Sequence, residues 1–301
     1  MAVDVSICIA SYRRPEGLAR LLESLERMKR PADLCLEVVV VDNDPGASVE
    51  SASHAAVAAT SLPACWLHEP RRNIAHARNA AVDRARGRWL AFVDDDEVVG
   101  EGWLEAHWKT VQGLQCDGCF GPVVPRASAP GPRWLDIETF YSRPRHPTGT
   151  RVERSGTRTS NAFVRRGAIG ELRFDPSLGR SGGSDVELFG RLLERGCDLR
   201  WCDEAVVEEL VPPERHRLGW LMQRAFRGGC VVAHLEAGDA RPPGRAGRVL
   251  RALLGVSGFG ILALVALVGG RRAAVRPLLR ACVQAGRLYR YGGGWYEEYR
   301  G

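Results

Sequence analysis

Three consecutive carboxylates, Asp94, Asp95 and Asp96, follow directly on an apolar run in the segment WLAFVDDDEVVGEGWLE, residues 89–105. Like charges at adjacent positions repel one another, and the end of a strand half inside a domain screens that repulsion poorly. A compensating cation is therefore expected beside them, and a divalent metal ion is the simplest candidate. Carboxylate oxygens favour Mg²⁺ or Mn²⁺. The alternative is an acidic turn that is merely solvated.

Apolar runs and helical patterns alternate through the first 115 residues, which defines the elements that would position these acids. The runs predict strands at 5–11, 35–42, 64–69 and 88–94, and helices at 15–28 and 73–87, with a weaker helix between the second and third strands. Such alternation predicts a mainly parallel sheet flanked by helices, an open α/β architecture of Rossmann type. Ligands of such sheets bind beyond the carboxyl ends of the strands, where Asp42 and the 94–96 cluster both fall.

The second half of the chain is less regular. Residues 125–156 are rich in Pro, Gly, Ser and Arg, which predicts a long loop over the ligand edge of the sheet. Regular pattern resumes with TSNAFVRR, and then a glycine-rich turn leads into a helix in GGSDVELFGRLLERG, residues 182–196. This turn places Asp185 near the start of that helix.

Composition and charge distinguish two parts of the 301-residue chain. A hydrophobic content of 45% with 26% charged residues is normal for a folded protein. The first residues lack a basic start and a cleavage site, so we expect the protein to stay in the cytoplasm. Residues 215–301 hold fifteen arginines, no lysine and four acids, a net charge of +11 against +6 for the whole chain. The acidic body and the basic tail are therefore expected to face different partners.

The tail contains an uncharged stretch, residues 252–270, with arginines on both sides. As a helix it reaches roughly 28 Å, just short of a comfortable membrane span of about 20 residues. The segment after it is basic and amphipathic, with aromatic residues suited to an interface. We expect a re-entrant or interfacial hairpin with both ends in the cytoplasm; a single span and a buried core helix are the alternatives. The predicted division is a catalytic domain at 1–238 and a membrane-associating helical region at 239–301.

Four segments occur in an order that resembles a known family: VSICIASYRRPEGLARLLESL, EVVVVDND, RRNIAHARNAAVDRARGRWLAFVDDDE and GGSDVELFGRLLERG. Over residues 3–228 the chain resembles the family 2 inverting glycosyltransferases, whose nucleotide-sugar domain has the fold called GT-A. The segment VPPERHRLGWLMQRAFRGG is similar to the bacterial branch that elongates lipid-linked or surface polysaccharides. The resemblance implies metal-dependent transfer of a sugar from a nucleotide-diphospho-sugar, most often a UDP-sugar, to a hydroxyl of a lipid-linked or saccharide acceptor in cell-envelope or exopolysaccharide synthesis.

The D-x-D pattern of this family assigns roles within the acidic cluster. Asp96 would hold the metal, Asp94 would reach the ribose or share the metal, and Asp95 would assist in binding the nucleotide. Which two of the three act stays open. A metal ion there, Mg²⁺ or Mn²⁺, neutralises charge on the leaving diphosphate as a Lewis acid.

Further positions match family residues that bind the nucleotide. Asp42 would hydrogen-bond the nucleobase, although Asp is also common in turns and at helix N-caps. Asn73, with Arg72 beside it, would face the nucleotide or cap its helix. The remaining positions are at the end of the first strand, where Ala10 and Tyr12 would form the floor under the base and Arg14 would reach a phosphate.

Asp185 matches the base-bearing turn of the family. An inverting transfer is one in-line displacement, so a carboxylate opposite the leaving group suits removal of the acceptor proton. A helix cap is its alternative role. His216, among arginines, is expected at the surface.

Two other classes of function fit the sequence less well. A phosphatase with a D-x-D motif needs that motif on its first strand and a lysine later in the chain, and here the motif is on the fourth strand and only Lys109 follows. A non-catalytic sugar-nucleotide-binding or scaffolding protein is the other alternative, and acids at all expected places argue against it. The expected partners are a nucleotide-sugar, the acceptor and an anionic membrane surface at the cytoplasmic face of the inner membrane, and not nucleic acid. The sequence does not indicate an oligomeric state.

Overall fold

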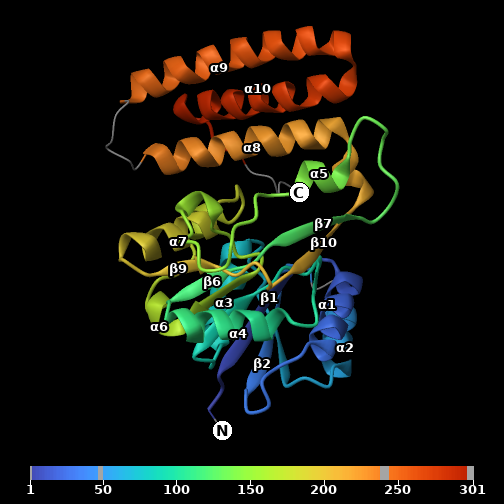
Figure 1. Ribbon diagram of the computed structural model, residues 1–301, viewed down its shortest axis with the longest axis vertical. Coiled ribbons are helices and arrows are strands. Elements are labelled where there is room, and N and C mark those ends of the chain that lie inside the picture. The colour runs from blue at the N-terminus through green and yellow to red at the C-terminus, as the bar shows by residue number, and fades with distance from the viewer. Residues whose placement is uncertain (1, 47–49, 238–243, 297–301) are drawn as a thin grey trace. The chain divides into compact units, whose positions relative to one another are not determined.

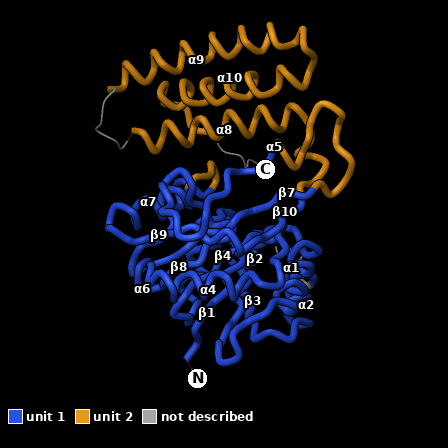
Figure 2. The backbone as a smooth tube through the Cα atoms, in the orientation of Figure 1, with its two compact units in different colours: residues 1–126, 141–179, 184–210 blue, residues 127–140, 180–183, 211–301 orange. Residues whose placement is uncertain are grey.

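The computed structural model describes residues 2–46, 50–237 and 244–296 (Figure 1). Within it the chain forms two compact units, coloured separately in Figure 2. Unit 1 consists of residues 1–126, 141–179 and 184–210, and unit 2 of residues 127–140, 180–183 and 211–301. The domain boundary expected between residues 238 and 239 lies outside the described residues.

Unit 1 is built on a seven-stranded sheet with the order β3-β2-β1-β4-β8-β6-β9. The four strands expected from the sequence are β1 (Val5–Ser11), β2 (Leu36–Asp42), β3 (Ala64–His68) and β4 (Trp89–Phe92), and they are parallel. The other three are β6 (Gly118–Phe120), β8 (Ala162–Arg165) and β9 (Leu199–Trp201). Strand β8 runs antiparallel to both β4 and β6. The expectation of a mainly parallel sheet is confirmed.

Both faces of this sheet are buried, as the apolar composition of β2 predicts. Val38 and Val40 face one layer of the core, together with the apolar side of α1 (Pro15–Arg27). Val39 and Val41 face the other layer, where α3 (Ile74–Arg84) packs through alanines. Alternate residues of a strand point to opposite faces, so one run of valines anchors helices on both sides. The sheet is therefore a rigid support for the residues at its carboxyl edge.

Four more helices complete unit 1, namely α2 (Glu50–Ala59), α4 (Trp103–Leu114), α6 (Arg166–Ile169) and α7 (Ser184–Glu194). A small second sheet has the order β5-β10-β7, with β5 (Glu97–Val99), β7 (Val123–Ala127) and β10 (Val207–Val211). The long loop expected at 125–156 starts after β7 and contains one short helix, α5 (Ile137–Tyr141). The sequence therefore located this loop but missed its helix.

Unit 2 contains three long helices, α8 (Leu218–Ala237), α9 (Arg245–Ala266) and α10 (Arg271–Tyr291). The backbones of α8 and α10 touch at two glycines. A Cβ atom on Gly229 would lie 1.9 Å from the Val283 carbonyl oxygen, and one on Gly286 would lie 1.9 Å from the Phe226 carbonyl oxygen. Only residues without a side chain permit so close a crossing.

The expectation that His216 is a surface residue is wrong. It is 5% exposed, in the 3₁₀ turn Pro213–His216 just before α8, and its Nε2 lies 3.3 Å from the Val211 carbonyl oxygen. The arginines around it in sequence suggested solvent, but the turn directs the imidazole ring inward.

Candidate active site

The acidic turn after β4 is tied to the end of β1 through Asp95. Its Oδ2 accepts hydrogen bonds from the Ser11 hydroxyl (2.9 Å) and from the Tyr12 backbone N–H (3.2 Å), and its Oδ1 accepts from Arg14 Nη1 (2.9 Å). Asp95 is 4% exposed. Burial raises the pKa of its carboxyl to about 6, with Arg14 acting in the opposite direction. Asp95 thus positions the turn, and both its oxygens are engaged within the protein.

Asp94 and Asp96 are the partly exposed members of the cluster, with 30% and 17% of their side chains accessible. Asp96 Oδ2 accepts from the same Arg14 Nη1 at 3.0 Å. Asp94 accepts from Arg78 Nη2 (3.2 Å) and from the Ser160 hydroxyl (2.7 Å). Two guanidinium groups therefore compensate the charge that the sequence assigned to a metal ion.

A fourth carboxyl group, that of Glu97, lies beneath the turn. It is 2% exposed, and its Oε2 accepts the Asp94 backbone N–H at 2.9 Å. Burial, and then the neighbouring Asp94, raise its pKa well above the usual range of a glutamate. Burial and the charge of Asp94 thus both act against ionisation of Glu97.

The donor set at the turn fits a divalent cation shared with a ligand. Within the described residues no three His, Cys, Asp or Glu side chains are grouped so that they could hold a metal by themselves. Asp94 and Asp96 supply two hard oxygen ligands at the protein surface. Mg²⁺ is commonly bound in this way, by one or two carboxylates together with phosphate oxygens of the substrate.

Asp42 closes β2 as a nearly inaccessible carboxyl group, 1% exposed. Its Oδ1 accepts the Asp44 backbone N–H at 3.0 Å, which is the turn role expected as an alternative. Its Oδ2 is buried without a hydrogen bond of normal length in the described part of the chain, although Ser53 lies close enough to affect its pKa. Burial raises that pKa. An unsatisfied buried acceptor is a suitable partner for an N–H group of a nucleobase.

The end of β1 forms a cationic, aromatic surface next to Asp42. Ser11 pairs with Asp42 across β1 and β2, so the residue after it begins at the same edge. The ring of Tyr12 lies 5.1 Å from the guanidinium carbon of Arg72 and 5.3 Å from that of Arg13. Ala10 is half-buried and packs against the core. The sequence did not single out Arg13, which also forms an ion pair with Asp44 (3.1 Å).

Asn73 is engaged entirely within the protein. It is the N-cap of α3, where its Oδ1 accepts the Ala75 backbone N–H (2.9 Å). Its Nδ2 donates to the Pro176 carbonyl oxygen (2.8 Å), and its own N–H donates to Asn43 Oδ1 (2.9 Å). The capping role is therefore observed, and Asn73 also ties the loop at Pro176 to the start of α3.

Asp185 lies in the first turn of α7, after Gly182 and Gly183, whose φ values are +87° and +96°. Its Oδ1 accepts the Val186 backbone N–H at 2.9 Å, and the residue is half-buried. Burial and the neighbouring Arg143 lower the pKa of Arg158. Glu97 and Asp185 raise that pKa, but each by less. Arg158 is thus close enough to both Asp185 and Glu97 to be affected by their charge.

A buried asparagine that the sequence did not mark fixes the geometry around Ser160. Asn161 has a left-handed φ of +59° and is fully buried. Its Nδ2 donates to the carbonyl oxygens of Pro122 and Ala205, and its Oδ1 accepts from Trp103 Nε1 (2.7 Å) and His107 Nε2 (2.9 Å). Ser160, which donates to Asp94, is therefore next in sequence to a residue whose side chain is fixed by four hydrogen bonds.

Comparison with known proteins gives consistent results. Residues 6–172 match the family described as Glycosyl transferase family 2. The chain is 35% identical to the succinoglycan biosynthesis protein ExoM of Rhizobium meliloti (strain 1021), over 95% of this chain and 93% of that protein.

Solved structures resemble the chain at lower identity. S. aureus TarS in complex with UDP aligns over 98% of this chain and 93% of that one, with a TM-score of 0.53 and 15% identity. The mannosyltransferase PcManGT from Pyrobaculum calidifontis, in complex with GDP-Man and Mn²⁺, aligns over 93% and 86%, with a TM-score of 0.59 and 18% identity. These likenesses bear out the GT-A fold expected from the sequence, and the family match shows that the chain belongs to glycosyltransferase family 2.

Proposed function

We propose that this chain transfers a sugar, with inversion, from a nucleotide-diphospho-sugar to a hydroxyl of a saccharide or lipid-linked acceptor. The observation that carries the proposal is the set of partly exposed carboxylates at one end of the sheet, Asp94 and Asp96 after β4, together with the unsatisfied Asp42 after β2. The UDP complex of TarS and the role of ExoM in succinoglycan biosynthesis support a UDP-sugar donor and a polysaccharide pathway.

Each part of the donor has a partner in this arrangement. Asp42 Oδ2 accepts an N–H of the base, which stacks near Tyr12. Asp94 and Asp96 would hold Mg²⁺ or Mn²⁺, the latter being present in the PcManGT complex. A cation held there would supply Lewis-acid stabilisation of the negative charge on the leaving diphosphate. Arg14, with 46% of its side chain exposed, binds a phosphate oxygen beside it.

Asp185 acts as the general base. Its Oδ1 accepts a backbone N–H, which leaves Oδ2 to take the proton of the acceptor hydroxyl. The oxygen of that hydroxyl attacks the anomeric carbon as the bond to the diphosphate breaks, so the configuration inverts in one step. Removal of the proton during attack prevents a positive charge from building on the acceptor oxygen.

The test is Asp185→Asn, which keeps the shape of the side chain and removes its basicity. Transfer should fall by roughly 10² to 10⁴, the range expected of general-base catalysis, while nucleotide affinity stays unchanged. Activity is measured by product formation from a donor chosen by screening UDP-, GDP- and dTDP-sugars for binding. Near wild-type turnover in the folded variant would reduce Asp185 to a helix-terminus residue. Donor binding by the wild type without any transfer or hydrolysis would favour a non-catalytic sugar-nucleotide-binding protein.

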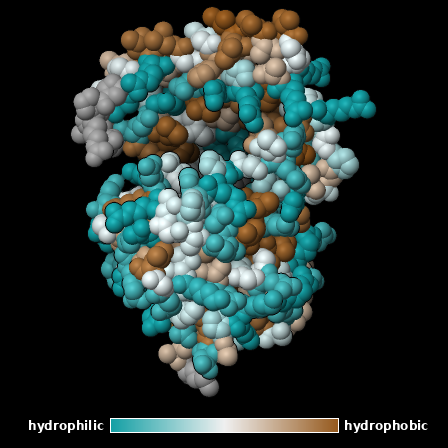
Figure 3. Space-filling view, viewed as in Figure 1, coloured by the Kyte–Doolittle hydropathy of each residue, from teal (hydrophilic) through white to brown (hydrophobic). Residues whose placement is uncertain are grey.

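Unit 2 is proposed to hold the enzyme at the cytoplasmic face of the inner membrane. Within the described residues one helical segment, Arg245–Gly269, is long and apolar enough to cross a membrane, and only 11% of its most apolar window is buried. Figure 3 shows apolar residues gathered over α9. Leu254 and Leu264 of this helix are 66% and 68% exposed, and Val268, in the 3₁₀ turn that follows it, is 94% exposed. Such a surface is unusual in a monomer that is only in contact with water.

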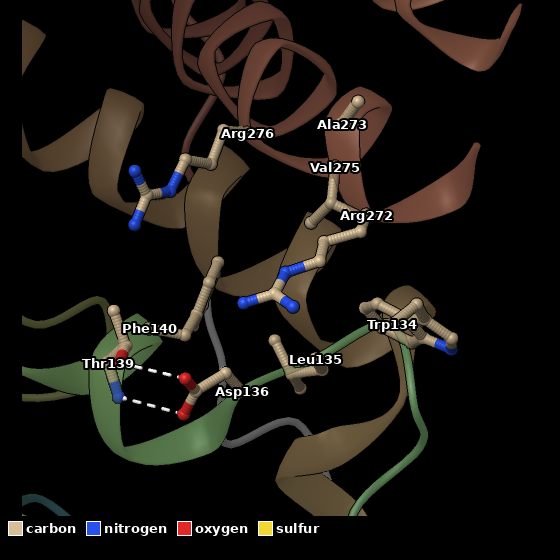
Figure 4. Close-up of a pocket in the computed structure, with 9 residues that line it drawn as sticks. All are labelled: Trp134, Leu135, Asp136, Thr139, Phe140, Arg272, Ala273, Val275 and Arg276. Atoms are coloured by element: carbon tan, nitrogen blue, oxygen red, sulfur yellow. Dashed lines mark hydrogen bonds between the residues drawn. The ribbon is translucent and has the colours of Figure 1, made fainter. Parts of the chain in front are cut away.

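The partner helix of α9 favours an interfacial position over a span. Helix α10 packs along α9 and carries six arginines, at 271, 272, 276, 280, 287 and 290. Arginine is expensive in the hydrocarbon layer, so α10 keeps the hairpin at the surface. Arg272 and Arg276 also line a cavity of about 290 Å³ with Trp134 and Phe140 (Figure 4). Anionic head groups would be attracted to this basic end of the hairpin.

A further inference from the structure

A cavity of about 440 Å³ in unit 1 has no part in the roles described above. Its wall comes from the segment 143–158 and from β9, and it combines four cationic or titratable side chains with one indole. These side chains are Arg143, His146, Arg151, Arg158 and Trp201. Glu153 is the one acid on the wall among the described residues, and it is exposed. The cavity is therefore strongly basic, although unit 1 is the more acidic part of the chain.

Arg158 is the unusual member of this wall. It is 7% exposed, its Nε is buried without a hydrogen-bond partner, and the described residues offer its guanidinium no hydrogen bond or ion pair. Its closest aromatic contact is the ring of Trp201, 5.9 Å from its guanidinium carbon. Burial and the neighbouring Arg143 lower its pKa to about 10, so it remains charged near neutral pH. A buried charge without a hydrogen-bonded or ion-paired partner is costly, and Asp185, Glu97 and Glu209 offset only part of that cost electrostatically. An anion held by Arg158 and Arg143 would reduce it further.

The position of the cavity relative to the sheet decides which substrate it faces. The nucleotide residues follow β1 and β2, whereas Trp201 belongs to β9, at the opposite edge of the sheet. The acidic turn follows β4, between these two regions. Arg158 comes two residues before Ser160, which donates to Asp94, and it feels the charge of Asp185. Along the order of the strands, the cavity therefore lies on the side of the acidic turn away from the nucleotide residues.

We propose that this cavity is an acceptor subsite for an anionic group, a carboxylate or a phosphate ester, held by Arg158 and Arg143. The assignment of this cavity to the acceptor rests on the proposed function, whereas the assignment of an anion site does not. A guanidinium group matches both anions because its N–H groups can form paired hydrogen bonds to two oxygens. The volume is sufficient for a charged monosaccharide unit, so the cavity would select acceptors by charge at one position.

The experiment measures anion binding by isothermal titration calorimetry on the full chain, first saturated with UDP and Mg²⁺ so that the donor site is filled. The probes are glucuronic acid, glucose and inorganic phosphate. Glucuronic acid or phosphate should bind at least about tenfold more tightly than glucose, as loss of one charge-assisted hydrogen bond would predict. Tighter binding of glucuronic acid assigns the site to a sugar carboxylate, and tighter binding of phosphate assigns it to a phosphate ester.

Variants locate the effect. Arg158→Met should weaken binding of the preferred anion at least about tenfold and leave glucose unchanged. Because Arg158 is buried, Arg143→Gln provides the second test; Arg143 is exposed and should fold normally. Arg195→Gln, an exposed arginine in the same unit but outside the cavity, is the matched control and should bind like the wild type.

The outcomes separate this inference from the proposed function. Equal binding of glucose and both anions to the wild type, or unchanged anion binding in Arg143→Gln, overturns the subsite even if UDP binds and transfer occurs. Arginine-dependent anion binding in a protein that binds no nucleotide-sugar would retain the anion site and remove the proposed function instead. The two ideas therefore fail on different measurements.

Discussion

Arg14 compensates negative charge in the acidic turn and links two of its carboxylates. One of its nitrogens lies 2.9 Å from Asp95 and 3.0 Å from Asp96. The two carboxylates are not equivalent, because Asp95 is also bonded to the end of β1 whereas Asp96 is partly open to solvent. A metal ion at Asp96 would compete with Arg14, and the displaced guanidinium would be available to a phosphate. Ion and arginine would then divide the charge of the diphosphate between them.

Asp96→Ala should abolish metal-dependent nucleotide binding, because it removes a ligand oxygen that the diphosphate cannot replace. Calorimetric titration with UDP, with and without Mn²⁺, measures this. Glu101→Ala is the control, since Glu101 is an exposed carboxylate five residues after Asp96 that forms an ion pair with the exposed Lys29 (3.2 Å). Affinity equal to that of the wild type in folded Asp96→Ala would remove the metal role from this residue.

Sequence reasoning found the acids of the site but not their partners. Asp42, Asp94 and Asp96 follow apolar runs that are recognisable as strands, so their common edge could be inferred. Arg78 and Ser160 could not, because 16 and 66 residues separate them from Asp94, and the chain has 42 basic residues, nearly all of them arginine. Nothing local distinguishes an arginine that will fold back onto a carboxylate.

At the scale of elements, α4 is held against β8 by a small polar centre inside the core. His107 stacks on Phe163, with ring centroids 5.3 Å apart, and donates from Nε2 to Asn161 Oδ1. Its Nδ1 lies 3.1 Å from Cys119 Sγ. The asparagine oxygen can only accept, so Nε2 carries a proton, and in the neutral imidazole Nδ1 is then the acceptor that faces the thiol.

The stability of unit 1 should consequently depend on pH through His107. Burial lowers its pKa to about 4, below the ordinary value of 6.5 that it regains on unfolding. Its contribution to stability is therefore complete above about pH 6.5 and is lost as the pH falls toward 4, by up to about 3 kcal/mol. Urea unfolding at pH 7 and pH 4.5 measures the loss. His107→Gln retains a donor toward Asn161. Its free energy of unfolding should fall between pH 7 and pH 4.5 by about 3 kcal/mol less than that of the wild type. An equal fall in the two proteins would contradict the role of His107.

Long elements were predictable and short ones were not. The strands β1 and β2 have seven residues each, and their apolar runs are clear. Strands β5, β6 and β9 have three residues each, too few to show a period of two. The antiparallel direction of β8 depends on β4 and β6, which are distant in sequence, and its own residues carry no signal for it.

At the scale of the whole molecule, the basic residues and the apolar stretch found near the end of the sequence both lie in unit 2. The tail identified by its net charge of +11 forms helices in which α9 exposes apolar side chains and α10 supplies arginines. Helices α9 and α10 pack on one another as a helical hairpin. Its position at a membrane remains the proposal made above.

The full chain should sediment with vesicles that contain anionic lipid and should require detergent for extraction from cell membranes. Replacing three exposed residues of one α9 face with glutamine, Leu254, Ile261 and Val265, should release it to the supernatant, because each loses its burial in lipid. Arg271→Gln with Arg272→Gln should weaken binding to anionic vesicles only and reduce its salt dependence. Recovery of the unmodified chain in the soluble fraction at low salt without detergent would defeat the proposal.

The close crossing of α8 and α10 at two glycines should make their packing insensitive to the surrounding solvent. At Gly229 and Gly286 backbone meets backbone, and the Cys230 thiol donates to the Gly286 carbonyl oxygen at 3.3 Å. Close contacts of this kind depend on dispersion and local dipoles and gain little from the release of water. Their strength is therefore nearly the same in buffer, in a micelle or beside acyl chains. The two helices should therefore stay paired through solubilisation and reconstitution. A change of solvent that loosens a core packed by leucines should leave this helix contact intact.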